Sequence, residues 1–148
     1  MAILIQTEPF DPGAEANTFL EASAGAGAAV TFTGLVRSDA RDPIISLTLE
    51  CYPELAIAQI GELEAQAVAR FGLLRATVIH RYGELKPGEP IVQVMTLAPH
   101  RHAAFEAAEF LMDYLKTDAP FWKKEAGPAG TRWVEHNTAD DRARSRWS

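Results

Sequence analysis

Strand-like segments come in pairs between the helical segments of this chain, and this order restricts its fold more than any other feature. A parallel sheet with crossover helices would alternate single strands with helices, whereas paired strands favour an antiparallel or mixed sheet. The expected helices span residues 12–22, 53–71 and 100–116, and the expected strands span 3–6, 28–36, 44–51, 77–82 and 91–98. The sequence therefore predicts an α+β fold, in which strands 28–36 and 44–51 pair as a hairpin with a long loop.

The expected helices have start and stop signals. Asp11 is a suitable N-cap before Pro12, and Gly72 is a typical C-terminal stop. The third helix has an apolar face whose residues recur at helical spacing, namely Phe105, Ala108, Met112 and Leu115. Short extended segments follow at 121–124 and 132–135, and the polar tail from about residue 137 is expected to fray. We expect one domain over residues 1–148.

The charge of the chain is unevenly distributed. The net charge is -6, which argues against general binding of nucleic acids. Residues 1–74 carry three Lys or Arg and ten Asp or Glu, whereas residues 75–148 carry eleven and ten, so the cations concentrate in the second half. No apolar run is long enough to cross a bilayer, and the single cysteine, Cys51, excludes an internal disulfide. We expect a cytoplasmic protein without a metal site or a resident cofactor.

Basic residues stand at both ends of the third helix. His100 and Arg101 begin it, where cations oppose the helix dipole and an anion site is a better explanation than capping. Lys116 ends it, where a cation is favourable for structural reasons alone. If Lys116 and Lys123 converge, each lowers the proton affinity of the other, and one can act as a neutral base or nucleophile. His80, in a strand, is more simply explained as a structural residue.

Ordered motifs along the chain resemble a known family. They are FTGLVR at 32–37, LTLE at 47–50, VIHR at 78–81, GEL at 83–85, HR at 100–101, MDYLK at 112–116 and APFWKKE at 119–125. Together they are similar to the large, catalytic subunit of molybdopterin synthase, and the similarity covers most of the chain. The resemblance implies an α/β hammerhead-type fold with a mixed or antiparallel sheet and an additional antiparallel β subdomain.

The resemblance also implies an activity and partners. The protein would be a sulfurtransferase of molybdenum cofactor biosynthesis that converts cyclic pyranopterin monophosphate to molybdopterin. Two sulfur atoms would come from the thiocarboxylate at the C-terminal Gly-Gly of a small, ubiquitin-like carrier subunit. The large subunit would form a homodimer, and two carriers would complete a heterotetramer.

The site residues that the resemblance implies fall into two groups. Those of the substrate site are Leu35, Val36, Arg37, His100, Arg101, Lys116, Lys123, Lys124 and Glu125. Lys116 would be the central catalytic group, as base or nucleophile. Lys123 would stabilise developing negative charge and tune the reactivity of Lys116. In a dimer, His100 and Arg101 could serve the neighbouring copy. The residues alone leave two alternatives open, a dimeric module that binds a phosphorylated ligand and a phosphate-ester hydrolase.

Overall fold

The structure is a computed structural model that describes residues 2–134 and 138–148. Its helices are α1 (Pro12–Phe19), α2 (Pro53–Phe71), α3 (Arg101–Thr117) and α4 (Thr138–Ser145). Its strands are β1 (Ala2–Gln6), β2 (Ala28–Leu35), β3 (Ser46–Glu50), β4 (Arg75–Arg81), β5 (Gly83–Leu85), β6 (Pro90–Ala98), β7 (Trp122–Gly127) and β8 (Gly130–Val134). In these residues, no helix is both long and apolar enough to cross a membrane.

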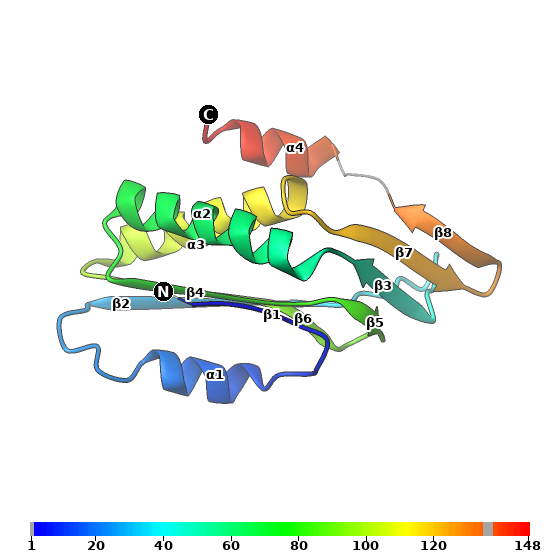
Figure 1. Ribbon diagram of the computed structural model, residues 1–148, viewed down its shortest axis with the longest axis horizontal. Coiled ribbons are helices and arrows are strands. Elements are labelled where there is room, and N and C mark those ends of the chain that lie inside the picture. The colour runs from blue at the N-terminus through cyan, green and yellow to red at the C-terminus, as the bar shows by residue number, and fades with distance from the viewer. Residues whose placement is uncertain (1, 135–137) are drawn as a thin grey trace.

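The first sheet is mixed and carries helices on both faces. Its strand order is β1-β4-β6-β2, in which β1 runs parallel to β4 and the other neighbours are antiparallel. Helices α2 and α3 cover one face and α1 covers the other (Figure 1). Asp11 caps α1 by accepting hydrogen bonds from the backbone N–H groups of Gly13 and Ala14, as the sequence predicts.

The second sheet is antiparallel, with strand order β5-β3-β7-β8. It extends from one end of the first sheet (Figure 1), and the two sheets together confirm the predicted α+β class. The expected hairpin of residues 28–36 and 44–51 is wrong. β2 pairs with β6, and β3 pairs with β5 and β7 in the other sheet, because the long segment between them carries the chain from one sheet to the other.

The main core lies between the first sheet and the helices α2 and α3. The buried face of α3 contains Ala104, Ala107, Ala108, Phe110, Leu111 and Leu115. Phe105, expected on that face, is 61% exposed, because the buried stripe runs through its small neighbours instead. The ring of Phe110 packs against those of Phe71, Tyr114 and Trp147.

The C-terminal segment is a docked helix rather than the frayed tail that was expected. Trp147 is buried and donates a hydrogen bond from Nε1 to Asp113 Oδ2 on α3 at 2.7 Å. Arg144 pairs with Asp118 at 2.9 Å, just beyond the end of α3. The aromatic anchor and the ion pair hold α4 against α3, so the polar composition of the segment did not prevent it from packing.

The two phenylalanines of α3 predict contrasting effects on stability. Phe110→Ala removes a buried ring and leaves a cavity, so we expect it to lower the free energy of unfolding by about 3–5 kcal/mol. Phe105→Ala removes an exposed ring from the same helix and should change the stability by about 0.5 kcal/mol or less. Chemical denaturation of the two variants checks this, and equal losses would contradict the assigned core.

Candidate active site

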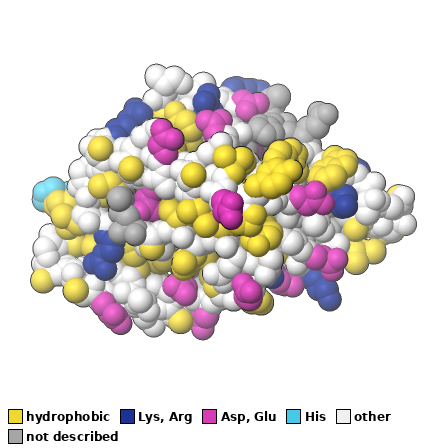
Figure 2. Space-filling model, viewed as in Figure 1, with side chains coloured by type: hydrophobic (Ala, Val, Ile, Leu, Met, Phe, Trp, Pro, Cys, Tyr) yellow, Lys and Arg dark blue, Asp and Glu magenta, His cyan; other side chains and the backbone are white. Residues whose placement is uncertain are grey.

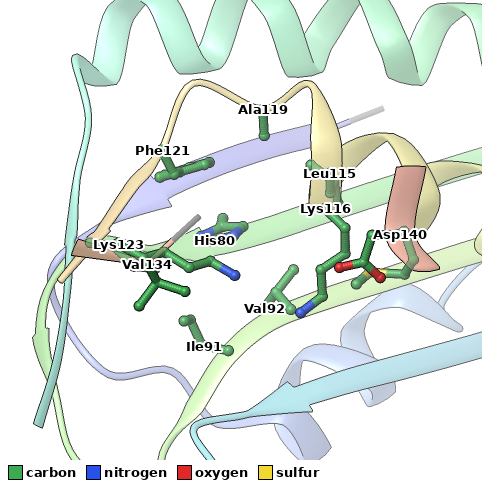
Figure 3. Close-up of a pocket in the computed structure, with 12 residues that line it drawn as sticks. His80, Ile91, Val92, Leu115, Lys116, Ala119, Phe121, Lys123, Val134 and Asp140 are labelled. Atoms are coloured by element: carbon green, nitrogen blue, oxygen red, sulfur yellow. The ribbon is translucent and has the colours of Figure 1, made fainter. Parts of the chain in front are cut away.

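Two lysines and a histidine share one cavity of about 110 Å³. Lys116 comes from the last turn of α3, Lys123 from β7 and His80 from β4. Lys116 and Lys123 reach into the cavity from opposite sides (Figure 3). The other lining residues are mainly apolar, and they are Leu49, Ile91, Val92, Met112, Leu115, Ala119, Phe121, Val134 and Asp140.

The surroundings of Lys123 make its amine easier to deprotonate. Burial lowers the pKa of Lys123, and the nearby charge of Lys116 lowers it further. Asp140 and Glu125 act in the opposite direction, but they are smaller influences than burial. The structure therefore brings together the two lysines whose convergence their spacing left open.

His80 belongs to the same cavity, although its place in a strand predicted a structural role. It shares a face of β4 with Val78, and that face lies beneath α2 and α3. Its ring stacks on Phe121, with 4.0 Å between ring centroids and 14° between planes. Burial lowers the pKa of His80 to about 4, so the ring is neutral near pH 7. The alternation along β4 is the signal that could have assigned His80 to the helix-covered face.

Two further residues of the predicted site lie at the opposite end of α3. His100 and Arg101 are exposed and line a surface hollow of about 600 Å³ with Gly27, Pro99, His102 and Phe105. Along α3, the rise from Arg101 at this hollow to Lys116 is about 23 Å. Within one chain, the structure therefore does not bring His100 and Arg101 to the lysine cavity.

The predicted residues Leu35 to Arg37 lie at the lysine end of the first sheet. Leu35 pairs with Pro90, and the next residue of β6, Ile91, lines the cavity. Leu35 is exposed, whereas Val36 is buried and exchanges backbone hydrogen bonds with the segment before β6. Arg37 is exposed and pairs with Asp39 at 3.4 Å, and it is not among the residues that line the cavity.

Lys124 and Glu125 do not line the cavity. Lys124 is on the opposite face of β7 from Lys123, 3.9 Å from Glu50 and over the ring of Trp133 at 5.3 Å. Glu125 pairs with Arg132 at 3.3 Å and lines a separate hollow of about 330 Å³. The cysteine is no substitute nucleophile, because burial raises the pKa of the Cys51 thiol and Cys51 is not a lining residue.

A groove beside the cavity leads to exposed aromatic side chains. It encloses about 310 Å³ and shares Ala119, Phe121, Lys123 and Val134 with the cavity. Its outer part contains Trp122 and Trp133, which with Tyr52 form what we call the aromatic patch. Tyr52 and Trp122 meet edge to face, with 6.1 Å between their ring centroids. On the face seen in Figure 2, hydrophobic side chains gather over the region of β3 and β7.

These features define a class of protein: an α+β domain with a small, partly apolar cavity that holds two amines and a neutral imidazole. Among residues 2–134 and 138–148, no three His, Cys, Asp or Glu side chains lie close enough to hold a metal ion. Proton transfer, nucleophilic attack and stabilisation of a developing anion are the reactions that such groups support.

Comparisons with known proteins identify the family. The profile described as MoaE protein matches residues 5–118, so the chain belongs to the MoaE protein family. It is 52% identical over 147 residues to the molybdopterin synthase catalytic subunit of Cereibacter sphaeroides, covering 99% of this chain and 100% of the relative. The resemblance stated from the sequence motifs is thereby confirmed.

Solved structures agree with this assignment. A molybdopterin biosynthesis MoaE protein from Burkholderia ambifaria has a TM-score of 0.83 and 42% identity, covering 99% of this chain and 98% of that one. A protein–protein complex of subunits 1 and 2 of the molybdopterin-converting factor from Helicobacter pylori contains a chain with a TM-score of 0.76 and 20% identity, covering 90% of each chain. At that identity, the second likeness is one of fold.

Proposed function

We propose that this chain is the catalytic subunit of a molybdopterin synthase and that its lysine cavity is the place of sulfur transfer. The substrate is cyclic pyranopterin monophosphate, and the sulfur comes from the thiocarboxylate of a small carrier protein. The carrier brings the sulfur, so the enzyme needs no thiol of its own. The observation that carries the proposal is the pair Lys116 and Lys123 in one small cavity, with the pKa of Lys123 lowered by burial and by its neighbour.

The two lysines have different tasks in this proposal. The thiocarboxylate sulfur first adds to the substrate, and water then adds to the carbonyl carbon, where Lys116 stabilises the developing charge. The carbon–sulfur bond of the carrier breaks, which leaves the sulfur on the substrate and an ordinary carboxylate on the carrier. Lys123, whose pKa is lowered, accepts and returns the proton that this step requires. A pair of amines in a partly apolar cavity supports such a division, because only one of two adjacent amines keeps its proton easily.

The groove and the aromatic patch support docking of the carrier. A C-terminal Gly-Gly tail has no side chains, so it is thin enough to lie along a narrow groove between Phe121 and Val134. Exposed aromatic side chains such as Tyr52, Trp122 and Trp133 are enriched at protein interfaces. The two-subunit complex from Helicobacter pylori, whose fold is similar, supports a partner of this kind.

We propose further that two copies of the chain form a dimer and that each completes the other's site. The distance along α3 separates His100 and Arg101 from the lysine cavity of their own chain. A second copy can bring its His100 and Arg101 to the cavity rim, where they would bind the phosphate of the substrate. With one carrier for each copy, the assembly is a heterotetramer, and we propose that it works in the cytoplasm.

The carrier requirement tests this function. The wild-type protein, given the cyclic precursor and a thiocarboxylated carrier, should form the dithiolene product, which is measured by chromatography of its oxidised fluorescent derivative. The same carrier with an ordinary C-terminal carboxylate supplies no sulfur and is the matched control. A protein that binds the precursor but forms no product with either carrier would instead be a phosphate-binding module.

A further inference from the structure

His80 lines the same cavity as Lys123 and contacts the segment that precedes β7. The residue is 9% exposed, and its ring stacks on Phe121, which lies just before β7 and two residues before Lys123. Figure 3 shows His80 between the backbone segments that carry Lys116 and Lys123. The charges of both lysines act on this ring, with that of Lys123 the larger.

The hydrogen bond of His80 identifies its tautomer. Nδ1 is 2.8 Å from the backbone carbonyl oxygen of Arg81, and a carbonyl can only accept, so Nδ1 carries the hydrogen. In a neutral ring, Nε2 is then an acceptor. Within the described part of the chain, no hydrogen bond to Nε2 is found. The ring remains neutral at physiological pH because burial lowers its pKa to about 4.

We propose that His80 is a positioning residue for Lys123: its Nε2 has no hydrogen bond among the described residues, and in the working site the Lys123 amine turns to donate to Nε2, which fixes the direction in which that amine faces the cavity. The charged groups around this contact are Lys116 on α3, Asp140 on α4 and Glu125 on β7. A carboxylate in the place of His80 would hold the amine too, but it would favour the ammonium form. A neutral imidazole orients the amine and leaves it easier to deprotonate. The inference rests on the proposed role of the lysine pair.

Two substitutions separate positioning from simple support of the fold. His80→Asn keeps a donor for the Arg81 carbonyl but is too short to present an acceptor where Nε2 lies. His80→Gln is long enough to present one. We expect His80→Asn to lower kcat on the order of 10- to 100-fold with little change in KM, and His80→Gln to recover much of the loss.

The titration of Lys123 gives a readout that a structural role would not move. In His80→Asn, loss of the acceptor should shift the pKa of Lys123 further down, measured from the ¹³C resonance of its ε carbon. A lowered melting temperature with an unmoved Lys123 titration and no advantage of Gln over Asn would make His80 a structural support only. Wild-type kcat in His80→Asn would also refute the proposal.

The wild-type protein offers a test that needs no variant. Imidazole ¹⁵N spectra at pH 7 should show a protonated Nδ1 and an unprotonated Nε2 for His80. A proton on Nε2 would overturn the inference, whatever the variants do. Activity retained by the lysine variants would instead refute the proposed function of the lysine pair. The tautomer of His80 and the titration of Lys123 would still test the contact between these two residues, independently of that function.

Discussion

Lys116→Ala should abolish formation of the dithiolene while the protein keeps its fold. Lys116 is exposed at the end of α3, so the substitution removes no core packing. It removes the amine that we propose to act at the thiocarboxylate carbonyl and leaves Lys123 without its partner. Loss of a group that transfers protons or stabilises the transition state costs about 10²–10⁴-fold in rate, and we expect kcat to fall by at least that much.

Two further variants define what Lys116 contributes. Lys116→Arg keeps the positive charge but has no neutral form at working pH, so it should be as inactive as Lys116→Ala if the amine reacts. Activity in the arginine variant would mean that Lys116 only binds an anion. Lys86→Ala removes an exposed lysine in the turn before β6, and it should behave as the wild type. A fully active Lys116→Ala protein would contradict the catalytic assignment.

Mixing two inactive variants should restore activity if the site is shared across a dimer. Arg101→Ala lacks the proposed phosphate ligand, and Lys116→Ala lacks the amine, so neither homodimer has a complete site. In an equal mixture, about half of the dimers contain one copy of each variant, and each of these has one intact site. We therefore expect about a quarter of the wild-type activity after the subunits exchange.

The length of α3 is the physical reason for this expectation, because one chain cannot present both of its ends to one small substrate. A mixture of Lys116→Ala with Lys123→Ala is the matched control. Both substitutions affect the same cavity, so no mixed dimer has an intact site and no activity should return. Recovery in the control, or none in the first mixture, would contradict the shared site.

Much of the fold could be predicted because helix and strand periods are local. The boundaries of α2, α3, β4 and β6 lie within a few residues of the predicted ones. Strand pairing is not local: nothing in residues 28–36 indicates that their partner is β6 and not the next strand. The docking of α4 was missed for a similar reason. Its anchor is one residue, Trp147, whose partners lie on α3.

The site was predictable in part. Lys116 and Lys123 flank a proline break in one continuous segment, so their convergence could be considered from spacing alone. His80 meets them only through the contact of β4 with Phe121 in the segment before β7, which sequence spacing does not encode. His100 and Arg101 were correctly expected at the start of a helix. Their distance from the lysines depends on the length and direction of α3, which only the structure provides.

The residues that line the lysine cavity come from β3, β4, β6, α3, β7, β8 and α4, and from the segment between α3 and β7. A growing chain emerges from the ribosome with its N-terminal end first. All four strands of the first sheet precede α3, so that framework can assemble while the rest is still being made. The cavity is completed only when α4 has emerged. During synthesis, the first sheet can therefore form before the cavity is complete, and the subunit is able to act only after α4 has been made.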